Sequence, residues 1–208
     1  GATTGSSGGS RGGGSTGSYP EIPSQEVDFA TSVAFLHSGE SPVQVGVAPG
    51  AIEPDRACVV RGRVLDTDGQ PLGGATIEVL NAPQYGSTLS QASGEYDLAL
   101  SGGGAVTLRF SMVGRLPAQR TVSTPFNNYA FAEDGVLVPR VSQSTVVNRN
   151  NGLQVARGPV ETDQDGSRQS TLIFPEGTTA QVVLPDGSTQ AISGLTLSQT
   201  EYTVGSPV

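Results

Sequence analysis

Residues 58–75 read CVVRGRVLDTDGQPLGGA, in which an alternating run is followed by a turn signal. Every second residue from Cys58 to Val64 falls on one face, because successive side chains of a strand point to opposite sides. The pair Asp68 and Gly69 then favours a tight turn, since glycine adopts a positive φ without steric cost. The stretch therefore predicts a strand that reverses into an antiparallel sheet.

The same alternation continues downstream and predicts further strands at 75–80, 95–100, 105–112 and 119–122. The residues expected to point inward are Ala75, Ile77, Val79, Tyr96, Leu98, Leu100, Val106, Leu108, Phe110 and Met112. Several short strands with glycine punctuation and no helical period are typical of an antiparallel β-sandwich. We therefore predict an all-β chain with one sandwich at 58–124.

The first part of the chain divides into a tether and a lead segment. Residues 1–20 are rich in Gly, Ser and Thr and offer too little apolar surface to offset their ordering entropy, so they predict a flexible tether. In the lead segment, residues 21–57, the run 27–36 predicts a strand with a break in its alternation. Residues 43–47 stand between prolines and predict an extended stretch along a sheet edge.

The part of the chain after the sandwich predicts a connector at 125–150 and a second β unit at 151–208. Candidate strands lie at 153–156, 170–174, 179–184 and 200–204, divided by turns at 163–166, 175–177 and 185–187. We expect this unit to be incomplete, because the chain stops soon after its last strand.

The composition excludes several classes of function. The 208 residues include no Lys, one His and one Cys, and the formal net charge is −8. Without Lys, a Walker-type phosphate loop and a Schiff-base enzyme are impossible, and one His with one Cys cannot supply the four N or S ligands of a structural zinc site. The negative charge argues against nucleic acid and anionic membranes as partners. The sequence has no run of eighteen apolar residues, so it predicts no membrane-spanning helix.

The motifs of the sandwich occur in a recognisable order. Residues 60–75, 76–79, 93–98, 106–110 and 114–117 read VRGRVLDTDGQPLGGA, TIEV, SGEYDL, VTLRF and GRLP. This order resembles the carboxypeptidase regulatory-like, or transthyretin-like, domain, whose pattern runs G-x-V-x-D-x-x-G-x-P-L-x-G-A, D-G-x-Y-x-L and G-Y-x-P. Ser93 stands where that family usually has Asp, and Arg115 where an aromatic residue is usual. The resemblance covers about 58–124 and implies a transthyretin-like sandwich.

The wider arrangement carries a second resemblance. Residues 46–54, 154–159, 171–178, 184–189 and 201–205 read GVAPGAIEP, QVARGP, TLIFPEGT, LPDGST and EYTVG. They are similar to the N-terminal part of bacterial RHS or YD-repeat proteins, which are related to the teneurins. In that arrangement a transthyretin-like domain precedes a fibronectin-like plug at the mouth of a large β shell. The resemblance implies a non-catalytic role and a plug-like second unit, although no YD repeat lies within this chain.

Two Asp-rich turns, Asp66-Thr-Asp68-Gly69 and Asp163-Gln-Asp165-Gly166, raise the question of calcium binding. An EF-hand loop needs Gly at its sixth position and Glu at its twelfth, and neither turn has them. We interpret both as turns whose Asp oxygens accept backbone N–H groups, with a calcium site of another geometry as the alternative.

His37 and Cys58 are the chain's single imidazole and single thiol. A Cys-His nucleophile pair is conceivable, but nothing in the pattern orients one, so we interpret Cys58 as a core residue and His37 as a polar loop residue. Glu133 and Asp134, like the acids of the turns, are interpreted as solvated carboxylates and not as a glycosidase pair.

The aromatic residues that fall in predicted loops are Tyr19, Tyr85, Phe126, Tyr129 and Phe131. They could form a face for a sugar or a protein, although loop aromatics more often cover the edge of a core. The segment 126–131 is the best candidate for docking the two β units together.

These observations predict a non-catalytic structural or interaction module of a secreted or cell-surface assembly. We expect sheet edges and apolar faces to dock neighbouring domains or identical subunits, in one version as a fibre whose lead segment adds a strand to the next molecule. The alternative is a carbohydrate- or calcium-binding accessory module. We select no catalytic, cofactor-binding or metal-binding residue, and we expect no cofactor, no nucleic acid and no membrane insertion.

Overall fold

The computed structural model describes residues 27–148, 151–163 and 166–201, and most of its regular elements are strands. The all-β transthyretin-like sandwich is thereby confirmed. The predicted tether, 1–20, and the first residues of the lead segment lie outside the described residues. Within the described residues, no helix is long and apolar enough to cross a membrane.

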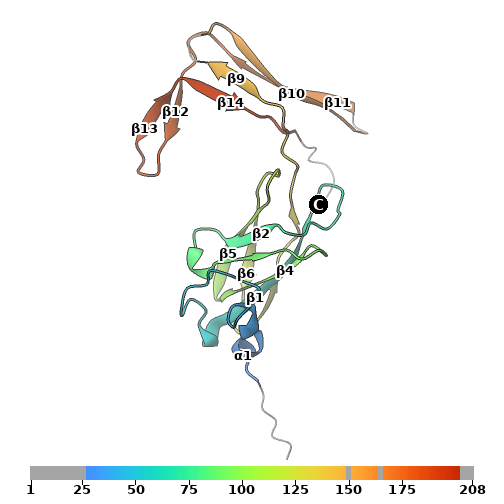
Figure 1. The fold of residues 1–208 in the computed structure, drawn as a ribbon, viewed down its shortest axis with the longest axis vertical. Coiled ribbons are helices and arrows are strands. Elements are labelled where there is room, and N and C mark those ends of the chain that lie inside the picture. Colours follow the sequence, from blue (N-terminus) through green and yellow to red (C-terminus); the bar gives the residue numbers. More distant parts are fainter. Residues whose placement is uncertain (1–26, 149–150, 164–165, 202–208) are drawn as a thin grey trace, which may run out of the picture.

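Two sheets form the sandwich (Figure 1). The first has the order β4-β1-β7, with β8 also paired to β1, and consists of β1 (Ala57–Leu65), β4 (Glu95–Ser101), β7 (Asn128–Phe131) and β8 (Gly135–Val136). The second has the order β3-β2-β5-β6 and consists of β2 (Thr76–Val79), β3 (Ser87–Leu89), β5 (Gly104–Ser111) and β6 (Ala118–Thr124). All pairs are antiparallel except those of β1 with β7 and β8, which are parallel.

The core lies between these sheets and follows the predicted alternation. Its buried residues are Cys58, Val60, Val64, Ala75, Ile77, Val79, Tyr96, Leu98, Leu100, Leu108, Phe110, Val122, Ala130 and Leu137. The rings of Tyr96 and Phe110 meet edge to face across it, with centroids 5.6 Å apart. Val106 and Met112, also expected to point inward, are only partly buried and pack against the margin of this core.

The turn after β1 has the predicted geometry. Gly69 adopts φ +74°, and the carboxylate of Asp66 accepts hydrogen bonds from the backbone N–H groups of Asp68 and Gln70 at 2.9 and 2.8 Å. The Asp side chain thus does what we expected of it, because it satisfies donors that the turn leaves unpaired.

The predicted strand at 27–36 is wrong, because these residues form helix α1 (Phe29–Val33) and the 3-10 helix η1 (Ala34–Leu36). Asp28 caps α1 by accepting the backbone N–H of Thr31 at 2.8 Å. Phe29, Val33 and Leu36 are spaced as one face of a helix, which explains the broken alternation. Two further 3-10 helices are η2 (Pro54–Arg56) and η3 (Pro83–Tyr85).

The segment expected to be a connector, 125–150, contains β7, β8 and β9 (Thr145–Asn148). The first two complete the sandwich by lying beside β1, where Val60 is in register with Ala130 and Val64 with Gly135. These are parallel pairings between segments far apart in the chain, so no local turn signal marks them.

The second β unit consists of three two-stranded sheets, β10-β11, β12-β13 and β14-β9. Its strands are β10 (Gln154–Asp163), β11 (Gly166–Phe174), β12 (Ala180–Val183), β13 (Thr189–Ile192) and β14 (Gly194–Leu197). The predicted strands at 153–156, 170–174 and 179–184 fall on β10, β11 and β12. At the predicted strand 200–204, residues 200 and 201 are not in a strand and the rest lie outside the described residues.

Candidate interaction surfaces

The lead segment covers the outer face of the first sheet. Because side chains alternate along β1, Cys58 and Val60 point into the sandwich while Val59 points outward. Val33 of α1 and Leu36 of η1 pack on Val59 and are themselves almost fully buried, at 2% and 4% exposure. A second, smaller core therefore holds the lead segment against the sandwich.

Gln44 of the lead segment is buried and satisfies the backbone of a strand. Its Oε1 accepts the N–H of Ala99 in β4 at 2.6 Å, and its Nε2 donates to the C=O groups of Ala99 at 2.8 Å and Tyr85 at 2.6 Å. The next residue, Val45, exchanges two backbone hydrogen bonds of 2.9 Å with Ser87 of β3. The predicted extended stretch does lie along a sheet edge, and one segment closes both β3 and β4.

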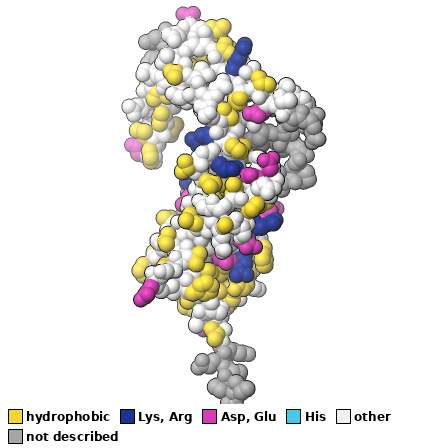
Figure 2. Space-filling view, turned by 45° about the vertical axis from the view of Figure 1, so that its right-hand side comes forward, with side chains coloured by type: hydrophobic (Ala, Val, Ile, Leu, Met, Phe, Trp, Pro, Cys, Tyr) yellow, Lys and Arg dark blue, Asp and Glu magenta, His cyan; other side chains and the backbone are white. Residues whose placement is uncertain are grey.

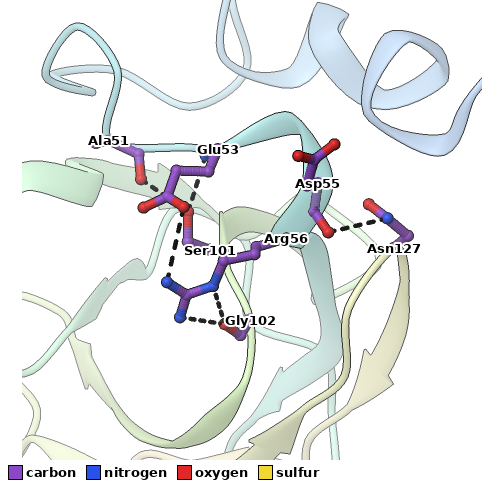
Figure 3. Close-up of polar contacts among 7 residues, drawn as sticks. All are labelled: Ala51, Glu53, Asp55, Arg56, Ser101, Gly102 and Asn127. Atoms are coloured by element: carbon purple, nitrogen blue, oxygen red, sulfur yellow. Dashed lines mark hydrogen bonds and ion pairs between the residues drawn. The ribbon is translucent and has the colours of Figure 1, made fainter.

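A cluster of polar contacts fixes the lead segment where it enters β1 (Figure 3). The hydroxyl of Ser101 donates to the C=O of Ala51 and accepts the N–H of Glu53, both at 2.9 Å. The guanidinium of Arg56 donates twice to the C=O of Gly102, at 3.2 and 2.9 Å, and lies 3.7 Å from the Glu53 carboxylate. The strand β4 and the lead segment are thus joined at the end of β4.

An open hollow of about 490 Å³ lies between α1 and η2, and Asp28, Phe29, His37, Ile52, Asp55 and Asn127 contribute to its lining. Asn127 adopts φ +46° and donates from Nδ2 to the C=O of Asp55 at 3.0 Å (Figure 3). Partial burial lowers the pKa of His37. At neutral pH its ring is therefore largely uncharged.

His37 and Cys58 lie on opposite sides of the first sheet. The Cys58 side chain is fully buried in the core between the sheets, whereas His37 follows η1 on the outer face. Burial raises the pKa of the Cys58 thiol to about 11, so it stays protonated at neutral pH. The two residues do not form a nucleophile pair.

The carboxylates that the sequence raised as possible metal or catalytic groups lie beside arginines or accept hydrogen bonds from the backbone of a turn. Asp134 pairs with Arg63 at 2.7 Å, and Glu133, which is 90% exposed, lies 3.9 Å from Arg120. Asp165 and the side chain of Asp163 lie outside the described residues. Among the described residues, no group of three or more His, Cys, Asp or Glu side chains is placed to hold a metal ion.

The prediction that Tyr129 and Phe131 lie in a loop is wrong, because both belong to β7, and Tyr85 ends η3. Tyr129 and Phe126 join the lead segment to the sandwich. The guanidinium carbon of Arg61 lies 4.3 Å from the centroid of the Tyr129 ring. The same ring packs edge to face on Phe29, with the two ring centroids 5.2 Å apart. Phe126 lies 5.5 Å from the guanidinium of Arg56, while Phe131 is 77% exposed. Segment 126–131 therefore ties the lead segment to the sandwich, which differs from the docking of the two β units that we expected. Tyr85 is partly buried against the core, and Tyr19 lies outside the described residues.

The second β unit exposes much of its apolar surface. Its exposed large side chains are Val146, Leu153, Val155, Val160, Leu172, Ile173, Val182, Val183 and Leu184. Val155 and Ile173 are partners in the β10-β11 pair and are 43% and 63% exposed. Figure 2 shows hydrophobic side chains at the surface of the upper part of that view, where this unit lies. Among the described residues no further layer covers these two-stranded sheets, and isolated two-stranded sheets are only marginally stable in water.

A smaller hollow of about 110 Å³ lies where the three two-stranded sheets of the second unit meet. Side chains of Val147, Phe174, Ala180, Ile192 and Leu195 contribute to its lining. Its volume and apolar lining match one aliphatic side chain more closely than a cofactor, because ligand pockets are usually about 300 Å³ or larger.

Comparison with known proteins shows what the sandwich is similar to. Residues 52–137 match the family model described as the teneurin TTR-like domain. Teneurin-1 of Homo sapiens is 38% identical over 122 residues, which cover 58% of this chain and 4% of that protein. Teneurin-1 of Mus musculus is 30% identical over 163 residues, covering 76% and 6%, and teneurin-m of Drosophila melanogaster is 33% identical over 105 residues, covering 50% and 4%.

The chain thus spans about 4–6% of the length of these relatives. Among solved structures, hydroxyquinol 1,2-dioxygenase from Pseudomonas putida DLL-E4 aligns with a TM-score of 0.34 and 14% identity, over 50% of this chain and 64% of that one. A likeness at this level decides nothing about activity.

Proposed function

Because the chain contains a transthyretin-like domain similar to that of the teneurins, we propose that it is a non-catalytic extracellular or cell-surface interaction module whose second β unit docks on an adjoining part of a longer parent chain. The sandwich and the lead segment that covers its first sheet form one packed part of this module. The second unit is the part that needs a partner.

The observation that carries the proposal is the exposed apolar surface of β10 to β13. Val183 is 70% exposed, Ile173 is 63% exposed, and the two-stranded sheets that bear them are not covered by another layer of described residues. A large exposed apolar surface favours association, because burying it stabilises the complex by roughly 25 cal/mol per Å² removed from water. The docking face therefore consists of the exposed residues of β10-β11 and β12-β13.

The sandwich has fewer open edges than its strand order suggests, which supports docking through the second unit. The lead segment pairs with β3 through Val45 and satisfies β4 through Gln44. Native proteins cover edge strands in this way to prevent unwanted pairing. For the fibre version of the proposal, the lead segment would first have to leave these sites on its own sandwich.

Lysine substitutions on the docking face test the proposal. The chain would be co-expressed with the adjoining region of its parent, and the affinity would be measured by isothermal titration calorimetry for the unmodified chain and for I173K and V183K. We expect each variant to weaken binding at least about tenfold, since a buried unpaired charge is strongly unfavourable. V113K is the matched control, because Val113 is fully exposed on the sandwich. Equal binding by all three variants, or no binding by the unmodified chain, would contradict docking through this face.

A further inference from the structure

In the segment between the sandwich and the second unit, two adjacent residues are hydrogen-bonded to different units. The N–H of Arg140 donates to the C=O of Gly114 at 2.8 Å, which is a tie to the sandwich. The N–H of the next residue, Val141, donates to the hydroxyl of Thr200 at 3.2 Å, which is a tie to the second unit. Residues 140–144 belong to no helix or strand. The bond between Arg140 and Val141 is therefore the junction of the two units.

Arg140 differs from most of the other described arginines because its guanidinium has no ion pair and no hydrogen bond among the described residues, and the residue is exposed. The arginines whose side chains do have such partners are Arg56, Arg61, Arg63, Arg109, Arg115, Arg120 and Arg168. An unpaired guanidinium on irregular backbone can enter the acidic specificity pocket of another protein without first leaving a partner.

We propose that the Arg140–Val141 peptide bond is a processing site for an arginine-specific, trypsin-like serine endopeptidase, which separates the sandwich from the second β unit. The serine hydroxyl of the protease attacks the Arg140 carbonyl carbon, and the C–N bond breaks as the nitrogen of Val141 takes a proton. Water then hydrolyses the acyl-enzyme, which leaves a carboxylate on Arg140 and a new amino terminus on Val141. The proposal goes beyond docking, because it allows a protease to release the second unit from the sandwich.

Arg157 provides a control within the same chain. Its side chain is also exposed and also has no partner among the described residues, but its backbone lies in β10 in register with Thr171 of β11. A protease must draw several residues into an extended conformation in its own cleft. Before Arg140 this breaks isolated hydrogen bonds, such as the one from the N–H of Leu116 to the C=O of Val138, whereas in β10 it requires opening a continuous strand pair. A difference between the two bonds would thus report backbone accessibility and not side-chain exposure.

Limited digestion of the full chain with trypsin, followed by intact mass spectrometry over time, tests the proposal. We expect cleavage at Arg140–Val141 to be at least about tenfold faster than at Arg157–Gly158, because cleavage follows the population of the open form. R140Q should abolish the fragment that begins at Val141, whereas R157Q should leave its rate of appearance unchanged. Fragments from cuts at Arg11 and Arg149 differ in mass and are counted separately.

Circular dichroism of both variants would establish that they are folded, and both substitutions replace exposed side chains. Equal cleavage rates at the two bonds would overturn the proposal. So would an Arg140–Val141 bond that is cut only after the whole chain unfolds. These outcomes are independent of the docking experiment, because they are measured on the isolated chain.

Discussion

The side-chain amide of Gln44 pairs with the backbone of Ala99 as a neighbouring strand would, accepting its N–H at 2.6 Å and donating to its C=O at 2.8 Å. Gln44 is only 1% exposed, so this pairing takes place away from water. One lead-segment side chain therefore occupies a strand edge that would otherwise be open, and the integrity of the sandwich depends on a residue outside it.

Replacing Gln44 by Ala should lower the free energy of unfolding by about 2–3 kcal/mol, because it leaves both backbone groups of Ala99 buried without a partner. Chemical denaturation monitored by circular dichroism would measure the loss. Gln91→Ala is the control, since Gln91 is exposed and its change should stay within about 0.5 kcal/mol. Equal stabilities of the two variants would show that the pairing contributes nothing.

Tyr96 and Gly62 form a second testable pair. A Cβ on Gly62 would lie 2.7 Å from the hydroxyl of Tyr96, which has no hydrogen-bond partner among the described residues. We expect Gly62→Ala to destabilise by about 1–3 kcal/mol through overpacking. Tyr96→Phe should be nearly neutral, and in the double variant it should recover part of that loss. Strictly additive effects in this double-mutant cycle would contradict the steric explanation.

The thiol of Cys58 should make stability fall at alkaline pH. Burial raises its pKa from the ordinary value of 9.0 to about 11 in the folded chain. Its contribution is therefore fully present below pH 9 and is lost as the pH rises through 11, because only the unfolded chain releases the proton in that window. Comparing the pH dependence of unfolding with that of Cys58→Ala would isolate this contribution. Identical slopes between pH 9 and 11 would exclude it.

The Asp28 cap should control the order of α1. Hydrogen bonds from the backbone and side chain of Thr31 lower the pKa of Asp28, so the cap is fully formed at neutral pH and weakens as the pH falls below its ordinary value of 3.8. Asp28→Ala should increase amide hydrogen exchange in α1, whereas Asp28→Asn, which retains a capping oxygen, should change it less. Equal exchange in both variants would contradict the capping role.

Much of the sandwich was predictable because its information is local. The alternation from Cys58 to Val64 and the glycine at 69 specify a strand and a turn within a few residues, and β2, β4, β5 and β6 carry the same signal. The three-residue strand β3 was not predicted, because it is too short for an alternation to show. For segment 27–36 the same method gave a wrong strand, because its apolar residues fit neither the strand period nor the helix period cleanly. The Asp28 cap stabilises the helix that forms there.

The interaction surfaces were less predictable, because they depend on residues far apart in the chain. The pairing of β7 with β1 brings Ala130 beside Val60 without any connecting turn, and nothing near Arg140 in the sequence shows that its neighbour is attached to Thr200. The exposure of the apolar side chains in the second unit likewise could not be predicted, because it depends on the strands pairing in separate two-stranded sheets.

The amino-acid sequence alone determined the all-β class, the alternating core of the sandwich and the absence of any lysine-based chemistry. Only the tertiary structure decided that Gln44 is buried, that Cys58 and His37 lie on opposite faces, and that the apolar residues of β10 to β13 remain uncovered. The physical reason is that periodicity is a property of neighbouring residues, whereas burial and hydrogen-bond satisfaction depend on which distant segments the fold brings together.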